Sequence, residues 1–70
     1  MNRIKDVLSE QGLTQVWLSE NLEKSFNMVN RYCTNKQQPR LEVLYEIASL
    51  LEVEVSELLI SRDEYEHSHT

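Results

Sequence analysis

The residues best suited to chemistry in this 70-residue sequence lie between positions 26 and 33. The amide of Asn27 can donate and accept hydrogen bonds together, which suits the edge of an adenine base, and Arg31 can pair bidentately with guanine. Phe26 and Met28 offer an aromatic ring and a thioether that can contact a thymine methyl group. The same residues also fit a solvated helix on which Phe26 and Met28 pack into the core or a dimer contact. The segment therefore predicts either the reading of base edges or an ordinary polar helix.

Two short helices must position these side chains. Thr14 is a suitable N-cap for a helix over 15–22, and Ser25 is one for a helix over 26–33. The turn between the two helices then has about three residues. Two helices joined in this way can place the N-terminus of the second helix in the major groove of DNA.

The rest of the chain also favours helices. With one glycine and one proline the sequence is poor in tight turns, which indicates an all-α fold. We expect a first helix over 2–11, capped by Asn2 and ended by Gly12, which stands where a left-handed residue is needed. The strongest apolar periodicity predicts a helix over 41–51, and a short fifth helix follows over about 56–60. Residues 1–61 are expected to form one domain, and residues 62–70 a disordered acidic tail.

Several classes of protein are excluded at this stage. No apolar run is long enough for a membrane span and no signal peptide is evident, so a cytoplasmic location is expected. The single cysteine, Cys33, excludes an internal disulfide and is predicted to be a small core residue. The two histidines, His67 and His69, lie in the expected tail, and there is no glycine-rich phosphate loop. We therefore predict no enzyme, no catalytic residues, no metal site and no cofactor.

Charge is divided unevenly along the chain. The net charge is -5, but residues 1–40 hold six basic and four acidic side chains, a balance of +2, whereas residues 41–70 hold one basic and eight acidic side chains, a balance of -7. Such asymmetry indicates that one end faces a polyanion while the other stays in solvent or meets a different partner. Trp17 and Tyr45 lie outside the main apolar rows and could form a subunit interface or pack into the core.

The order of several residues resembles the phage-repressor and Cro-like helix-turn-helix family, also called the xenobiotic-response-element family. The resemblance covers roughly residues 4–60 without a gap. It rests on the residues Leu13-Thr14-Gln15, Leu18, Leu22, Ser25, Val29, Arg31, Tyr32, Lys36, Pro39, Leu41-Glu42-Val43-Leu44, Ile47-Ala48, Leu51, Val53 and Glu57-Leu58-Leu59. Family members often have glycine in the turn and after the fourth helix, where this chain has Glu23 and Glu52. Either these turns are built differently or packing enforces them, because a left-handed non-glycine residue costs about 1 kcal/mol.

The resemblance implies a compact five-helix, lambda-repressor-like domain in which helices 2 and 3 form the helix-turn-helix and a homodimer binds double-stranded DNA. The residues it implies for reading bases are Phe26, Asn27, Met28, Asn30 and Arg31. The residues it implies, together with the placement of basic side chains, for contacting phosphates are Gln15, Lys24, Ser25, Asn35, Lys36, Gln37 and Arg40. Gln38, like Gln37, is expected to approach the DNA backbone.

The function expected from these residues is that of a sequence-specific transcriptional regulator, most simply a repressor that occludes a promoter. Small relatives also serve as antitoxins, with a toxin partner, or as restriction-modification controllers. A different class is also open: a protein-interaction module that keeps the helical fold and uses the acidic fourth and fifth helices. In that case Trp17, Phe26 and Tyr45 would be its apolar anchors. The acidic net charge favours this alternative, because Lys and Arg side chains supply most non-specific DNA affinity.

Overall fold

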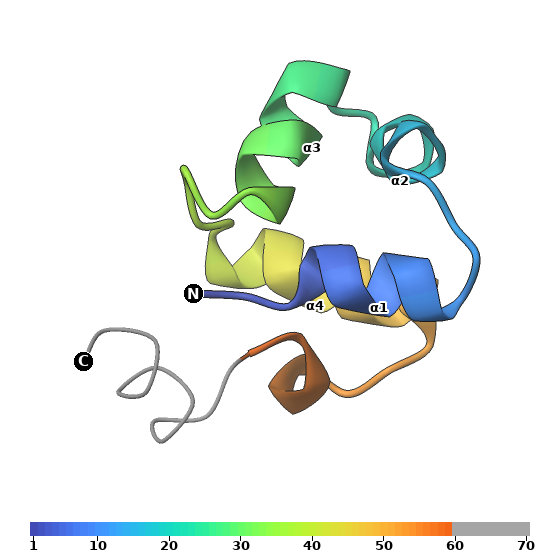
Figure 1. Cartoon of the computed structure of the whole chain (residues 1–70). Helices are drawn as coiled ribbons and strands as arrows, with labels where there is room; N and C mark the ends of the chain where they lie inside the picture. The colour runs from blue at the N-terminus through green and yellow to red at the C-terminus, as the bar shows by residue number, and fades with distance from the viewer. Residues whose placement is uncertain (60–70) are drawn as a thin grey trace.

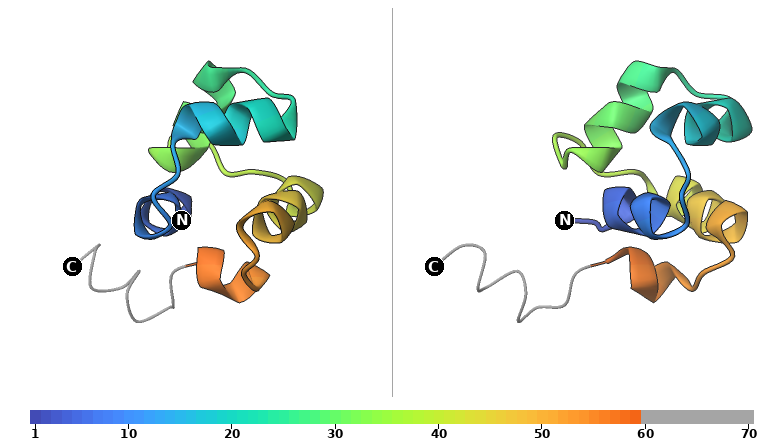
Figure 2. Two further views of the ribbon diagram at one scale, coloured as in Figure 1. Left: turned by 90° about the vertical axis from the view of Figure 1, so that its right-hand side faces the viewer. Right: turned by 45° about the vertical axis from the view of Figure 1, so that its right-hand side comes forward.

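The computed structural model describes residues 1–59, which fold into four α-helices and one 3₁₀ helix. The elements are α1 (Ile4–Glu10), α2 (Gln15–Leu22), α3 (Phe26–Cys33), α4 (Leu41–Leu51) and η1 (Val55–Leu58). In Figures 1 and 2, α2 and α3 form the upper part of the molecule, α1 and α4 lie below them, and η1 lies beneath both. The predicted all-α fold is confirmed, as are the predicted limits of α2, α3 and α4. The predicted tail and the last two residues of the predicted domain, 60 and 61, lie outside the described residues.

Every helix contributes to one apolar core. The fully buried side chains include Ile4 of α1, Leu18 of α2, Val29 of α3, Ile47 of α4 and Leu58 of η1. These residues come from five separate elements, so removing any one of them leaves a cavity that the others must close.

Cys33 is buried in the same core, as predicted, and this burial raises the pKa of its thiol above the ordinary value. The thiol therefore stays protonated and unreactive near neutral pH.

Side-chain caps fix the start of the two helices that matter most for the site. The Thr14 hydroxyl accepts a hydrogen bond from the Trp17 amide at 3.0 Å, and the Ser25 hydroxyl accepts one from the Met28 amide at 3.1 Å. Both caps are confirmed. Each satisfies a backbone N–H that has no partner within its helix.

The first and last predicted helices need correction. The first helix begins at Ile4 and not at residue 2, and the N-cap position is held by Arg3. Asn2 is buried and its side-chain oxygen accepts a hydrogen bond from the Ile4 amide at 3.1 Å, but its side-chain amide binds other parts of the chain. The fifth helix is a 3₁₀ turn that begins at Val55 and ends at Leu58, before residue 60.

Two glutamates adopt the left-handed conformation that glycine usually provides. Gly12 has φ 70°, as predicted, whereas Glu23 and Glu52 have φ values of 55° and 56°. At Glu52 the next amide, that of Val53, donates back to the Ala48 carbonyl at 3.0 Å, which is the pattern of a Schellman motif. Val53 then packs against the core. Packing of the following residue thus enforces the left-handed turn without glycine.

Replacing Glu52 by glycine should raise the free energy of unfolding by about 0.5–1 kcal/mol. The substitution removes a Cβ from a left-handed residue, although the more flexible unfolded chain offsets part of the gain. Urea unfolding followed by circular dichroism measures the change. The matched control is Ser49→Gly, an exposed position inside α4, which should lose about 1 kcal/mol. Equal effects of the two substitutions would contradict this account of the turn.

Candidate nucleic-acid interface

The exposed side of α3 carries the candidate base-reading groups. Val29, Tyr32 and Cys33 face the core, so Asn27 and Arg31 lie on the opposite side of the helix, and both are exposed. Figure 1 shows α3 at the edge of the molecule, with its first turn farthest from α4. An exposed polar helix with a free leading end has the form needed to enter a groove of a duplex.

The helix pair α2 and α3 has the predicted helix-turn-helix geometry. Glu23, Lys24 and Ser25 alone connect the two helices. Leu18 and Val29 are both fully buried in the shared core, which fixes the position of α3 on α2. The left-handed backbone of Glu23 ends α2 and redirects the chain into the next helix.

The five predicted base-reading residues divide into a central face and two flanks. Asn27 and Arg31 are on the central face, and Phe26 at the start of the helix is 47% exposed. Met28 lies on one flank, is half-buried and packs against the core beside α4. Asn30 lies on the other flank and is half-buried, because its amide donates to the Gln15 side chain at 3.0 Å.

The predicted phosphate-contacting residues surround α3 on both sides. Gln15 is the first residue of α2 and is held against α3 by Asn30. On the opposite side Lys36 and Gln37 are exposed, and the side-chain carbonyl of Gln37 accepts a hydrogen bond from the Arg31 guanidinium at 3.2 Å. This contact extends the polar surface of α3 onto the following loop.

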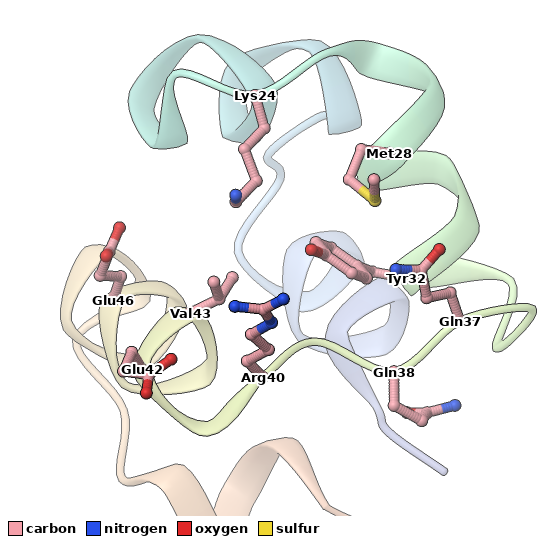
Figure 3. A pocket seen from close by; sticks show the side chains of 9 residues that line it. All are labelled: Lys24, Met28, Tyr32, Gln37, Gln38, Arg40, Glu42, Val43 and Glu46. Carbon is pink, nitrogen blue, oxygen red and sulfur yellow. The ribbon is translucent and has the colours of Figure 1, made fainter.

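Three further predicted contacts lie in the connections before and after α3. Ser25 is exposed, and its hydroxyl is already used as the α3 cap. Lys24 is half-buried and Arg40 is exposed at the N-terminus of α4. The side chains of Lys24 and Arg40 extend into the same cleft between α3 and α4 (Figure 3).

Asn35 belongs to a hydrogen-bond network that no local sequence pattern predicts. Asn35 has φ 61°, and its side-chain oxygen accepts from the Asn2 backbone amide at 2.8 Å. The Asn2 side-chain amide donates to the Tyr32 carbonyl and to the Gln38 side chain, both at 2.9 Å. The network ties the start of the chain to the loop after α3, which orients that loop. Partners 30 or more residues apart leave no local signal in the sequence.

The side chains around α3 include unpaired basic groups, although the formal net charge of the whole chain is negative. Within the described residues both ion pairs belong to Arg3, which contacts Asp6 at 3.9 Å and Glu10 at 3.5 Å on α1. The basic side chains around α3 therefore have no carboxylate partner in this part of the chain; they are Lys24, Arg31, Lys36 and Arg40. Unpaired cations around an exposed polar helix favour an anionic partner.

Other kinds of site find little support in the described chain. Residues 1–59 contain no group of three potential metal ligands, and His67 and His69 lie outside this range. Of the helices described, none has the length and apolar character to cross a membrane. Tyr45 is 57% exposed on α4, whereas Trp17 is half-buried and packs against the core.

Comparison with known proteins agrees with this geometry. A helix-turn-helix family model matches residues 4–58. A similar solved structure is a proposed DNA-binding protein from Bacteroides fragilis, with 46% sequence identity and a TM-score of 0.82 over 83% of this chain and 94% of that chain. No curated protein matches the chain at significant similarity. The matched residues include the whole of α1, α2, α3 and α4, with the turn between α2 and α3, and the chain therefore belongs to the Cro/C1-type helix-turn-helix family.

Proposed function

We propose that this protein is a sequence-specific DNA-binding regulator that places α3 in the major groove of its operator. The observation that carries the proposal is the exposed central face of α3, where Asn27 and Arg31 are exposed and point away from the core. Both side chains pair with base edges in the major groove. The family match and the Bacteroides fragilis neighbour support the same function.

The remaining predicted residues take two roles in this proposal. Phe26 at the leading end contacts a thymine methyl group, while the half-buried Met28 and Asn30 shape the flanks of α3. The contacts to the phosphates of the DNA backbone come from Gln15 on one side of α3. On the other side they come from Lys24, Ser25, Lys36, Gln37 and Arg40. Asn35 holds the loop after α3 in place, and through this loop it supports the contacts to the DNA backbone.

Action as a homodimer completes the proposal. Four basic side chains around α3 release only about four counterions per subunit, which gives weak binding for a single copy. A dimer doubles the contacts and reads two half-sites about one helical turn apart. In this proposal residues 1–61 form one domain and the protein acts in the cytoplasm. The simplest mode of action for such a domain is repression by occluding a promoter. An antitoxin or a restriction-modification controller would use the same binding mode.

Selection of bound duplexes from a random library tests the proposal. A palindromic consensus is the expected result, since it reflects the two-fold symmetry of a dimer.

The rival function, a protein-interaction module, is favoured by exposed Leu41 and Tyr45 beside Glu42 and Glu46 on α4. Absence of binding to any duplex at about 50 mM salt would leave that rival as the better explanation.

Replacing Lys36 by alanine should weaken binding to all duplexes by a similar factor. Lys36 is exposed on the loop after α3 and has no carboxylate partner within residues 1–59, so its expected role is a phosphate contact without base preference. The slope of log affinity against log salt should become shallower by about one per subunit. The control is Arg3→Ala, which removes a cation that is paired with acids of α1 and should leave the slope unchanged. A change in sequence preference in Lys36→Ala would contradict the assigned role.

A further inference from the structure

The Arg31 guanidinium is bound to the loop that follows α3. Its Nε–H donates to the side-chain oxygen of Gln37 at 3.2 Å, and the Gln37 backbone amide donates to the Arg31 carbonyl, also at 3.2 Å. The same two residues are thus joined by a side-chain and a backbone contact, and Figure 3 shows the Gln37 side chain beside α3. Because an exposed arginine ordinarily samples many rotamers, this pairing restricts the direction of the guanidinium.

The loop that carries Gln37 is itself held in place. The Asn35 side-chain oxygen accepts from the Asn2 backbone amide at 2.8 Å and from the Gln38 side chain at 3.1 Å. The Gln38 side-chain oxygen accepts from the Asn2 side-chain amide at 2.9 Å. Asn2 is buried, so these contacts fasten the loop to the body of the domain. Gln37 therefore offers Arg31 an acceptor in a fixed position.

The contact with Gln37 determines which donors of Arg31 are left for a base. Arginine has N–H donors on each nitrogen of its planar guanidinium, and the Gln37 oxygen occupies the donor on Nε. The donors on the terminal nitrogens, Nη1 and Nη2, make no hydrogen bond within residues 1–59. These terminal donors form the fork that pairs end-on with the O6 and N7 atoms of guanine.

The acceptor is neutral, which suits a surface that binds a polyanion. A carboxylate at position 37 would hold the guanidinium more strongly, but it would offset the positive charge and repel phosphates. A glutamine oxygen orients Arg31 and leaves its charge unpaired in the described part of the chain. The side-chain N–H groups of Gln37 stay available for the phosphate contact of the proposed function.

We propose that Gln37 is a positioning residue that sets base specificity, because its side-chain oxygen holds Arg31 end-on toward a guanine in the major groove. The inference rests on the proposed function, in which α3 enters the groove, and it gives a loop residue a part in reading a base that it need not touch. Without the acceptor, Arg31 keeps its charge but is free to turn toward phosphates. The loss then falls on the choice of base more than on binding as a whole.

Replacing Gln37 by methionine removes the acceptor and keeps a side chain of similar length. Arg31→Ala first identifies the base position that Arg31 reads, and competition assays then compare duplexes with guanine or adenine at that position. In Gln37→Met the preference for guanine should fall about three- to tenfold, the factor that one hydrogen bond ordinarily contributes. The preference is a ratio of affinities, so the loss of a phosphate contact, which weakens both duplexes alike, cancels.

Three control proteins separate this role from a structural one. Gln37→Glu keeps an oxygen acceptor and should keep the guanine preference, although its charge weakens binding to every duplex. Lys36→Ala should lose affinity without a change in preference. In the Arg31→Ala background, Gln37→Met should have no further effect on the preference, since the two residues act as one unit.

The contact itself is tested without DNA by the exchange of guanidinium protons with water, measured by NMR. The Arg31 Nε–H should exchange several-fold more slowly than that of Arg40, whose side chain makes no hydrogen bond within residues 1–59. Gln37→Met should abolish this difference.

Equal exchange of the Arg31 Nε–H in the parent chain and in Gln37→Met would overturn the contact. An unchanged guanine preference in Gln37→Met, or an equal loss of preference in Gln37→Glu, would overturn the specificity role. A parent chain that binds no duplex would remove the proposed function and the specificity role with it, whereas the exchange measurement would still decide the contact.

Discussion

Replacing Leu18 by alanine is expected to lower the free energy of unfolding by about 2–5 kcal/mol. Leu18 has no exposed surface and lies on α2 within the core that α2 shares with α3 and α4. Removing three side-chain carbons forfeits their burial and leaves a cavity that short helices can close only in part. A small domain has only a few kcal/mol of stability in total, so a large share of the variant should be unfolded at about 37 °C.

Thermal and urea unfolding, followed by circular dichroism, measure this loss. The matched control is Val16→Ala on the same helix, where the side chain is 51% exposed and the expected change is about 0.5 kcal/mol or less. A similar loss in both variants would show that helix propensity, and not burial, governs the stability of α2. Duplex binding by Leu18→Ala should fall in proportion to its folded fraction, since the residue lies away from the proposed interface.

The helices of this domain could be predicted because local rules act there. The N-caps Thr14 and Ser25 each bind a backbone amide three residues later, and the starts of both helices follow from these contacts. The apolar rows of α4 are likewise local. Segments governed by short-range hydrogen bonds and by a helical repeat leave a pattern that the sequence itself displays.

The errors arise where distant residues decide the local structure. Asn2 fits the role of an N-cap and its side-chain oxygen accepts from the Ile4 amide, but its side-chain amide binds the Tyr32 carbonyl and Gln38, and the first helix starts at Ile4. At the other end of the described chain, the Arg3 amide donates to the Leu58 carbonyl at 2.7 Å. This pairing of the two ends, together with the reciprocal capping of Glu54 and Glu57, accompanies a single 3₁₀ turn in place of an α-helix.

The candidate site shows the same division. The outward position of Asn27 and Arg31 follows from the helical repeat, since Val29 and Tyr32 must face the core. The flanks depend on neighbouring elements: Asn30 is drawn toward Gln15, and Met28 lines the cleft beside α4. No sequence pattern marks that cleft, because its walls come from segments that meet only in the folded chain.

Replacing Asn27 by alanine should relax the sequence preference at one base position of each half-site by about 1–3 kcal/mol. Asn27 is the second residue of α3, is exposed, and makes no side-chain hydrogen bond within residues 1–59. Its amide is therefore free to donate to and accept from an adenine edge in the major groove. Stability should change little, because the side chain packs against nothing in the core.

Duplex selection followed by sequencing, performed on both proteins under the same salt conditions, measures this change. The matched control is Asn21→Ala, another exposed asparagine, whose amide donates to the Trp17 carbonyl at 2.8 Å on α2. This control should keep the full consensus of the parent chain. An Asn27→Ala protein with an unchanged consensus would remove Asn27 from the base-reading set. A loss of affinity that is equal for every sequence would instead make Asn27 a contact to the backbone, because phosphates carry no information about bases.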